Sequence, residues 1–143
     1  MGVLLDAATL VAAVKGRLPV VLALAQLKPG DVCVSIVGQV QAETGLRLQP
    51  RAVARYGDLL KQLLATVRVI EFGSVEAQHA SQLAGYLAQQ QESLGGFELI
   101  QAATALAHGL TLVTEQPNRY LSVPGLDVDN WLRSSGAAAS ING

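Results

Sequence analysis

Short apolar runs alternate along the chain with longer segments whose apolar residues recur every three or four positions. The runs have the length and composition of buried strands and lie at residues 2–6, 32–37, 67–72 and 110–113. The longer segments predict helices at residues 7–15, 19–27, 38–46, 51–65, 74–91 and 97–108. This alternation is typical of strands joined by helical crossovers. We therefore predict an α/β fold, a three-layer α/β/α sandwich with a mostly parallel central sheet.

A few residues mark the ends of the predicted helices and of the sheet. Ser74 is predicted to be an N-cap, with Glu76 in the first turn beside the positive end of the helix dipole. His108, in the last turn before Gly109, is expected to interact with the negative end of its own helix rather than to act as a base. Residues 119–124 lead towards a last edge strand, and residues 126–132 are predicted to be a short tail.

Composition limits the class of protein to which the chain can belong. Its 143 residues suffice for one domain, which we place at residues 1–133, followed by a flexible tail at 134–143. Half of the residues are hydrophobic and only 4% are aromatic, so the core must be built from Leu, Val, Ile and Ala. The net charge of -1 excludes a global basic field, so any RNA contact would need a local patch.

The distribution of cysteine and of apolar residues indicates where the protein works. The single cysteine, Cys33, lies in an apolar run and is expected to be buried, and no disulfide can form within the chain. The first apolar run ends at Asp6, too early for a signal peptide or a membrane span. We expect a cytoplasmic protein with no membrane partner. Its Ala- and Leu-rich helices carry few charges, which favours a homodimer.

Acidic and amide side chains stand at the ends of predicted strands. Asp6 follows the first strand, Glu115 and Gln116 follow the fourth, and Glu98 opens the helix before it. In a parallel sheet these positions meet at one edge, where chemistry usually gathers. Each acid also has an ordinary structural role, Asp6 as a helix N-cap and Glu98 as a partner of the helix dipole. No glycine-rich phosphate loop follows any strand, which disfavours a nucleotide-binding domain.

Several motifs together give the chain a family resemblance. They are Leu4-Leu5-Asp6, Val34-Ser35-Ile36-Val37 before a helix containing Gly45, Gly96-Phe97-Glu98 opening Leu99-Ile-Gln-Ala-Ala-Thr-Ala-Leu-Ala-His-Gly, Leu112-Val113-Thr114, Val123-Pro-Gly-Leu and Asn130-Trp131. With this order of elements, residues 2–131 resemble the PIN domain, and within it the single-domain VapC-type toxin ribonucleases of bacterial toxin–antitoxin pairs. The segment 100–114 with its Val-Pro-Gly-Leu sequence is the most specific part.

The resemblance implies a metal-dependent nuclease site. Members of the family place three or four carboxylates on strand ends and helix starts, where Mg²⁺ or Mn²⁺ activates a water and stabilises charge on the phosphodiester. Asp6 matches the first-strand aspartate, and Glu98 matches the aspartate that opens the central helix. The helix glutamate of the family falls on Gln41. The Asn or Asp after the fourth strand falls on Gln116, next to Glu115.

Two departures weaken the implied site. Ala8 stands where the family usually has Asn or Ser, and Gln41 offers only a neutral oxygen. Glu43 cannot easily replace it, because two residues along a helix turn the side chain by about 200°.

We therefore keep two hypotheses. The chain is a weak Mg²⁺- or Mn²⁺-dependent endoribonuclease, with Asp6, Gln41, Glu98 and Gln116 as catalytic residues and Asp6, Glu98 and Glu115 as metal ligands. Alternatively, it is a catalytically inactive PIN-like module that binds protein or RNA. The implied partners are RNA and an antitoxin protein.

Overall fold

A central strand organises the structure. β1 (Val3–Leu5) pairs with β2 (Val32–Ser35) on one side and with β4 (Thr111–Val113) on the other. β3 (Arg68–Ile70) and β5 (Val128–Asp129) complete a five-stranded sheet in the order β3-β2-β1-β4-β5, with every pairing parallel. The predicted α/β class with a parallel central sheet is confirmed.

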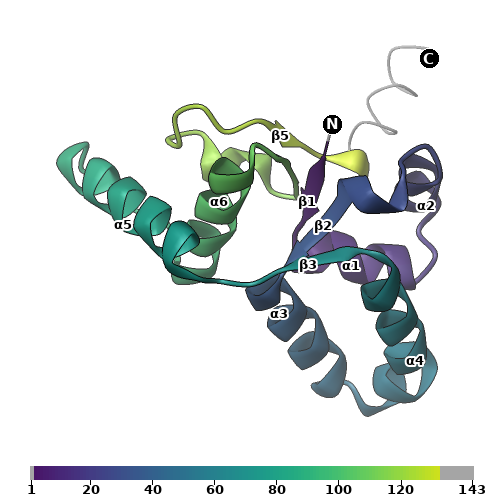
Figure 1. Cartoon of the computed structure of the whole chain (residues 1–143). Helices are drawn as coiled ribbons and strands as arrows, with labels where there is room; N and C mark the ends of the chain where they lie inside the picture. The colour runs from purple at the N-terminus through teal and green to yellow at the C-terminus, as the bar shows by residue number, and fades with distance from the viewer. Residues whose placement is uncertain (1, 133–143) are drawn as a thin grey trace, which may run out of the picture.

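Helices connect all but the last pair of consecutive strands. The computed structural model describes residues 2–132, so residue 133 and the tail predicted at 134–143 lie outside the described residues. In chain order the helices are α1 (Ala7–Val14), α2 (Leu18–Ala25), α3 (Ile36–Arg47), α4 (Pro50–Thr66), α5 (Ser74–Gln89) and α6 (Gly96–His108), with 3-10 turns η1 (Pro29–Asp31) and η2 (Pro117–Tyr120). Figure 1 shows α5 and α6 on one side of the sheet and α1, α3 and α4 on the other.

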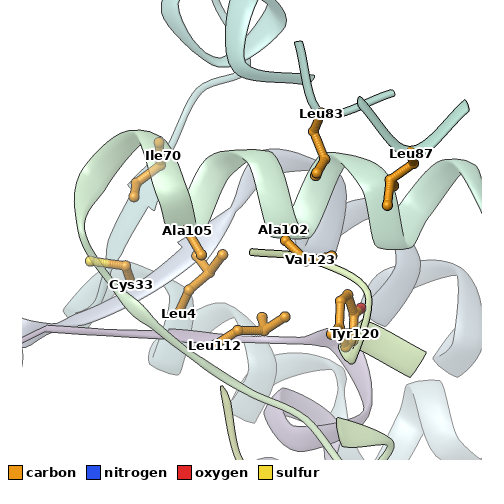
Figure 2. Packing of buried hydrophobic residues seen from close by; sticks show 10 residues of the cluster. All are labelled: Leu4, Cys33, Ile70, Leu83, Leu87, Ala102, Ala105, Leu112, Tyr120 and Val123. Atoms are coloured by element: carbon orange, nitrogen blue, oxygen red, sulfur yellow. The ribbon is translucent and has the colours of Figure 1, made fainter. Parts of the chain in front are cut away.

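The two faces of the sheet carry separate hydrophobic clusters, because successive residues of a strand point to opposite faces. Leu4 packs with residues of α5 and α6, whereas its neighbour Leu5 packs with residues of α1, α3 and α4. Figure 2 shows the first cluster, whose buried members are Leu4, Cys33, Ile70, Leu83, Leu87, Ala102, Ala105, Leu112, Tyr120 and Val123. The core is built almost entirely from aliphatic side chains, and the expected burial of Cys33 is confirmed.

Most predicted element ends lie within two residues of the observed ones, and three of the differences have a local structural cause. β2 ends at Ser35 rather than at residue 37, because the Ser35 hydroxyl accepts a hydrogen bond from the Gly38 N–H (2.8 Å) and so caps α3. The N-cap of α5 is Gly73, and Ser74 is its first helical residue. The edge strand lies within the predicted tail, after Gly125 (φ 75°) has turned the chain, and residues 117–120 form η2 instead.

A side-chain hydrogen bond joins the start of α5 to the end of α6. Glu76 Oε1 accepts from the Gly73 N–H at 2.8 Å, and Glu76 Oε2 lies 2.7 Å from His108 Nε2. His108 stands in the last turn of α6 as predicted, but its partner on another helix was not foreseen. The hydrogen bonds from Gly73 and then from His108 lower the pKa of Glu76, against the opposing effect of burial.

No single helix within residues 2–132 is long and apolar enough to cross a membrane. α1 and α2 together have the length and apolar composition of a membrane span, but the pair is bent by 94°.

The lowered pKa of Glu76 predicts a pH-dependent contribution to stability. Because the folded chain binds this proton less readily than the unfolded chain, the contribution is complete above the ordinary glutamate pKa of about 4.3 and is lost as the pH falls through the lowered folded-state value. We expect Glu76→Gln to be less stable than wild type at neutral pH, with the difference shrinking in acid. Urea unfolding across this pH range measures it, with exposed Glu71→Gln as control. A difference that stays constant into acid would contradict the assignment.

Candidate functional site

The carboxyl edge of the sheet is hollowed into a pocket of about 310 Å³. All five residues singled out from the sequence line it: Asp6, Gln41, Glu98, Glu115 and Gln116. They come from the end of β1, the middle of α3, the first turn of α6 and the loop after β4. The parallel topology accounts for the convergence, since it brings the ends of β1 and β4 to the same edge. We call this cavity the acidic pocket.

Asp6 has both of the roles that its sequence position suggested. Its Oδ1 accepts a hydrogen bond from the Thr9 N–H at 2.8 Å, which caps α1. Its own N–H donates to the Val113 carbonyl at 3.0 Å, so the residue is fixed between β1 and β4. The N-cap role therefore does not remove the carboxylate from the pocket, because the same side chain lines it.

Glu98 is held by a positive partner. Its Oε1 lies 3.0 Å from Nη1 of Arg119, and the side chain of Glu98 is 24% exposed. The carboxylate also folds back over the start of α6, where a Cβ added to Gly95 would lie 2.9 Å from Oε1. The positive end of the helix dipole lies at that helix start. The charge of Glu98 is thus offset by a guanidinium and by a helix N-terminus.

Gln101 forms the buried wall of the pocket. It is 2% exposed and follows Glu98 by three residues, so the two side chains share one face of α6. The Ser35 hydroxyl donates to Gln101 Oε1 at 2.8 Å. The Nε2 atom of Gln101 is buried and has no hydrogen-bond partner among the described residues. It lies against Gly38 of α3, where an added Cβ would come within 2.9 Å.

Tyr120 lies where the pocket meets the core. It packs in the cluster beneath α6, next to Leu112 in Figure 2, and also lines the pocket. Burial raises the pKa of its phenol, and the negative charges of Asp6 and Glu98 raise it further, while Arg119 opposes them. The phenol of Tyr120 is therefore within the electrostatic influence of Asp6, Glu98 and Arg119.

The fold has counterparts among known proteins. The PIN domain family matches residues 3–118 of the chain. The chain belongs to the PIN-domain family. A sequence relative of this PIN domain is the tRNA(fMet)-specific endonuclease VapC of Shigella flexneri, 25% identical over 105 residues, which cover 73% of this chain and 79% of the relative.

Solved toxin–antitoxin complexes share the fold. VapBC2 from Rickettsia felis, bound to a DNA fragment from its promoter, matches with a TM-score of 0.81 and 22% identity, covering 92% of this chain and 99% of the other. DNA-bound VapBC from Salmonella typhimurium matches with a TM-score of 0.81 and 20% identity, covering 92% and 98%. The predicted resemblance to VapC-type proteins is confirmed at the level of sequence and fold.

The pocket of this PIN domain does not fit a divalent cation as it stands. Asp6, Glu98 and Glu115 share the lining, yet within residues 2–132 no three His, Cys, Asp or Glu side chains gather closely enough to hold one metal ion. Gln41 contributes only a neutral amide to the lining. Mg²⁺ and Mn²⁺ bind most strongly where several charged oxygens converge, and here one of the acids is already paired with Arg119.

Sequence reasoning missed Gln101, Arg119 and Tyr120. The spacing of Gln101 from Glu98 was a usable signal, because a lone amide three residues after a candidate acid lies on the same helix face. Arg119 and Tyr120 belong to η2, which has no apolar periodicity from which their directions could be read.

The contact between Gly38 and Gln101 predicts opposite effects for two glycines of α3. Gly38→Ala should destabilise the protein by about 1 kcal/mol, because crowding of the Ser35–Gln101 hydrogen bond outweighs the higher helix propensity of alanine. Gly45→Ala is the matched control, since nothing lies within 4 Å of its added Cβ, and it should stabilise by about 0.5–1 kcal/mol. Urea unfolding measures both. Equal stabilisation by the two variants would show that Gln101 does not pack against Gly38.

Proposed function

We propose that this VapC-like PIN domain acts by binding a protein partner and does not carry out efficient metal-dependent RNA cleavage. The lack of efficient cleavage is supported most directly by the ion pair between Glu98 and Arg119 in the lining of the acidic pocket. It engages one of the two acids that match the family's carboxylates. Gln41 leaves a third position neutral, so the charge that would attract and hold a cation is reduced.

The charge of the pocket also disfavours RNA as the ligand. Asp6, Glu98 and Glu115 face one cationic residue of the described lining, Arg119. Such a pocket repels phosphate groups unless a divalent cation intervenes. The chain as a whole has a net charge of -1 and supplies no compensating attraction.

A protein partner is supported by apolar surface on α2. Leu18 and Leu22 are 64% and 54% exposed, and Val21 is exposed beside them. Only Val20 of this eight-residue helix is buried. A second copy of the chain is the simplest partner, since most soluble oligomers are symmetric homodimers. An antitoxin is the alternative partner, because similar proteins were crystallised in toxin–antitoxin complexes.

Weak Mg²⁺- or Mn²⁺-dependent endoribonuclease activity is the second candidate. It is favoured by the presence of Asp6, Gln41, Glu98, Glu115 and Gln116 in one lining. The Shigella flexneri relative, which is 25% identical, is named an endonuclease, and this also supports the ribonuclease candidate.

The two candidates differ in their response to Mn²⁺ and to RNA. We expect millimolar Mn²⁺ to shift the melting temperature of wild type no more than it shifts that of Asp6→Asn. This variant keeps an N-cap side chain on α1. We also expect no RNA cleavage above that of Asp6→Asn. Cleavage abolished both by EDTA and by Asp6→Asn would establish the ribonuclease instead.

The same preparations test the protein partner. Light scattering should give the mass of two chains for wild type and of one chain for Leu22→Asp, while Leu59→Asp, at an exposed position on α4, should behave as wild type. A single-chain mass for wild type would exclude the homodimer. Complex formation with a co-expressed antitoxin, lost in Leu22→Asp, would then be required for the proposal to stand.

A further inference from the structure

Arg119 is placed at the pocket by a rigid local structure. It belongs to η2, whose next residue, Tyr120, is anchored in the core. Its N–H donates to the Gln116 carbonyl at 3.1 Å, which ties η2 to the loop after β4. The guanidinium reaches Glu98 at 3.0 Å while 58% of its side chain is exposed. The arginine is thus directed at the acids without being needed for the core.

The position of the charge matters more than the energy of the pair. An ion pair this exposed contributes little to folding stability. It nevertheless fixes a permanent positive charge among the acids, because a guanidinium stays protonated at any physiological pH. Of the described residues that line the pocket, Arg119 alone is cationic.

We infer that Arg119 occupies the cation position of the acidic pocket as a built-in counter-ion, and that its presence opposes the binding of divalent cations independently of the neutral side chain at position 41. This inference rests on the proposed function, a pocket without a working metal site. A tethered guanidinium competes with free metal ions at a high effective concentration. It also repels any divalent ion that approaches Asp6 or Glu98, so a metal must both displace Arg119 and overcome its charge.

The inference separates two causes of poor metal binding, the neutral side chain at position 41 and the cation at position 119. Gln41→Glu restores the missing acid, and we use it as the background. In that background Arg119→Ala should tighten Mn²⁺ binding at least about tenfold by calorimetry. Millimolar Mn²⁺ should then raise its melting temperature by about 3 °C or more. Adding Asp6→Asn should abolish both effects.

Two matched variants control for charge and for fold. Arg119→Lys keeps a positive charge and should leave Mn²⁺ binding as weak as in the Gln41→Glu background alone. Arg51→Ala removes an exposed arginine outside the lining of the acidic pocket and should also change nothing. Melting curves without metal confirm that each variant folds.

The outcomes distinguish the inference from the proposed function. Equal Mn²⁺ affinity in Gln41→Glu with and without Arg119→Ala would overturn the inference. The proposed function would then still stand if wild type does not respond to Mn²⁺. Wild type that binds Mn²⁺ through Asp6 with Arg119 intact would overturn both.

Discussion

The gathering of carboxylates into one pocket at the edge of a parallel sheet is the constraint on which the site depends. The topology determines where these groups lie: Asp6 follows the central strand, and Glu115 follows the strand beside it. Like charges that share one pocket repel one another unless something offsets them. In this protein the offset comes from its own structure. Asp6 accepts a hydrogen bond from the first turn of α1. Glu98, in the first turn of α6, pairs with Arg119 of η2.

The rest of the fold supplies the rigidity that this arrangement needs. Leu4 and Leu5 are both fully buried and point into different clusters, so β1 is packed on both faces. This packing fixes the backbone from which the Asp6 side chain extends. The Ser35–Gln101 hydrogen bond ties the start of α3 to α6 across the pocket wall. The Glu76–His108 pair fastens α5 to the far end of α6. These contacts fix β1, α3 and α6, which contribute to the lining of the pocket, and α5, which packs on α6.

Much of this could be predicted from the sequence. Apolar runs separated by amphipathic segments require a parallel sheet, and such a sheet brings Asp6, Glu98 and Glu115 to one edge whatever the details of packing. The prediction was wrong where the structure depends on local turn geometry rather than on the periodicity of apolar residues. Ser74 resembled an N-cap better than Gly73 did, and the edge strand at Val128–Asp129 is too short to show alternation. Arg119 could not be assigned to the pocket, because its direction is set by the 3-10 turn that Tyr120 anchors.

The chain belongs to the PIN-domain family, yet no acid triad converges among residues 2–132. On the present account, Arg119 supplies the positive charge that a metal ion would otherwise bring to these acids. The most direct test is anomalous diffraction from crystals of the wild-type chain grown with millimolar Mn²⁺. The account predicts no manganese peak between Asp6 and Glu98, with Arg119 still in contact with the glutamate. A manganese ion bound by both acids, with the arginine turned away to solvent, would contradict it.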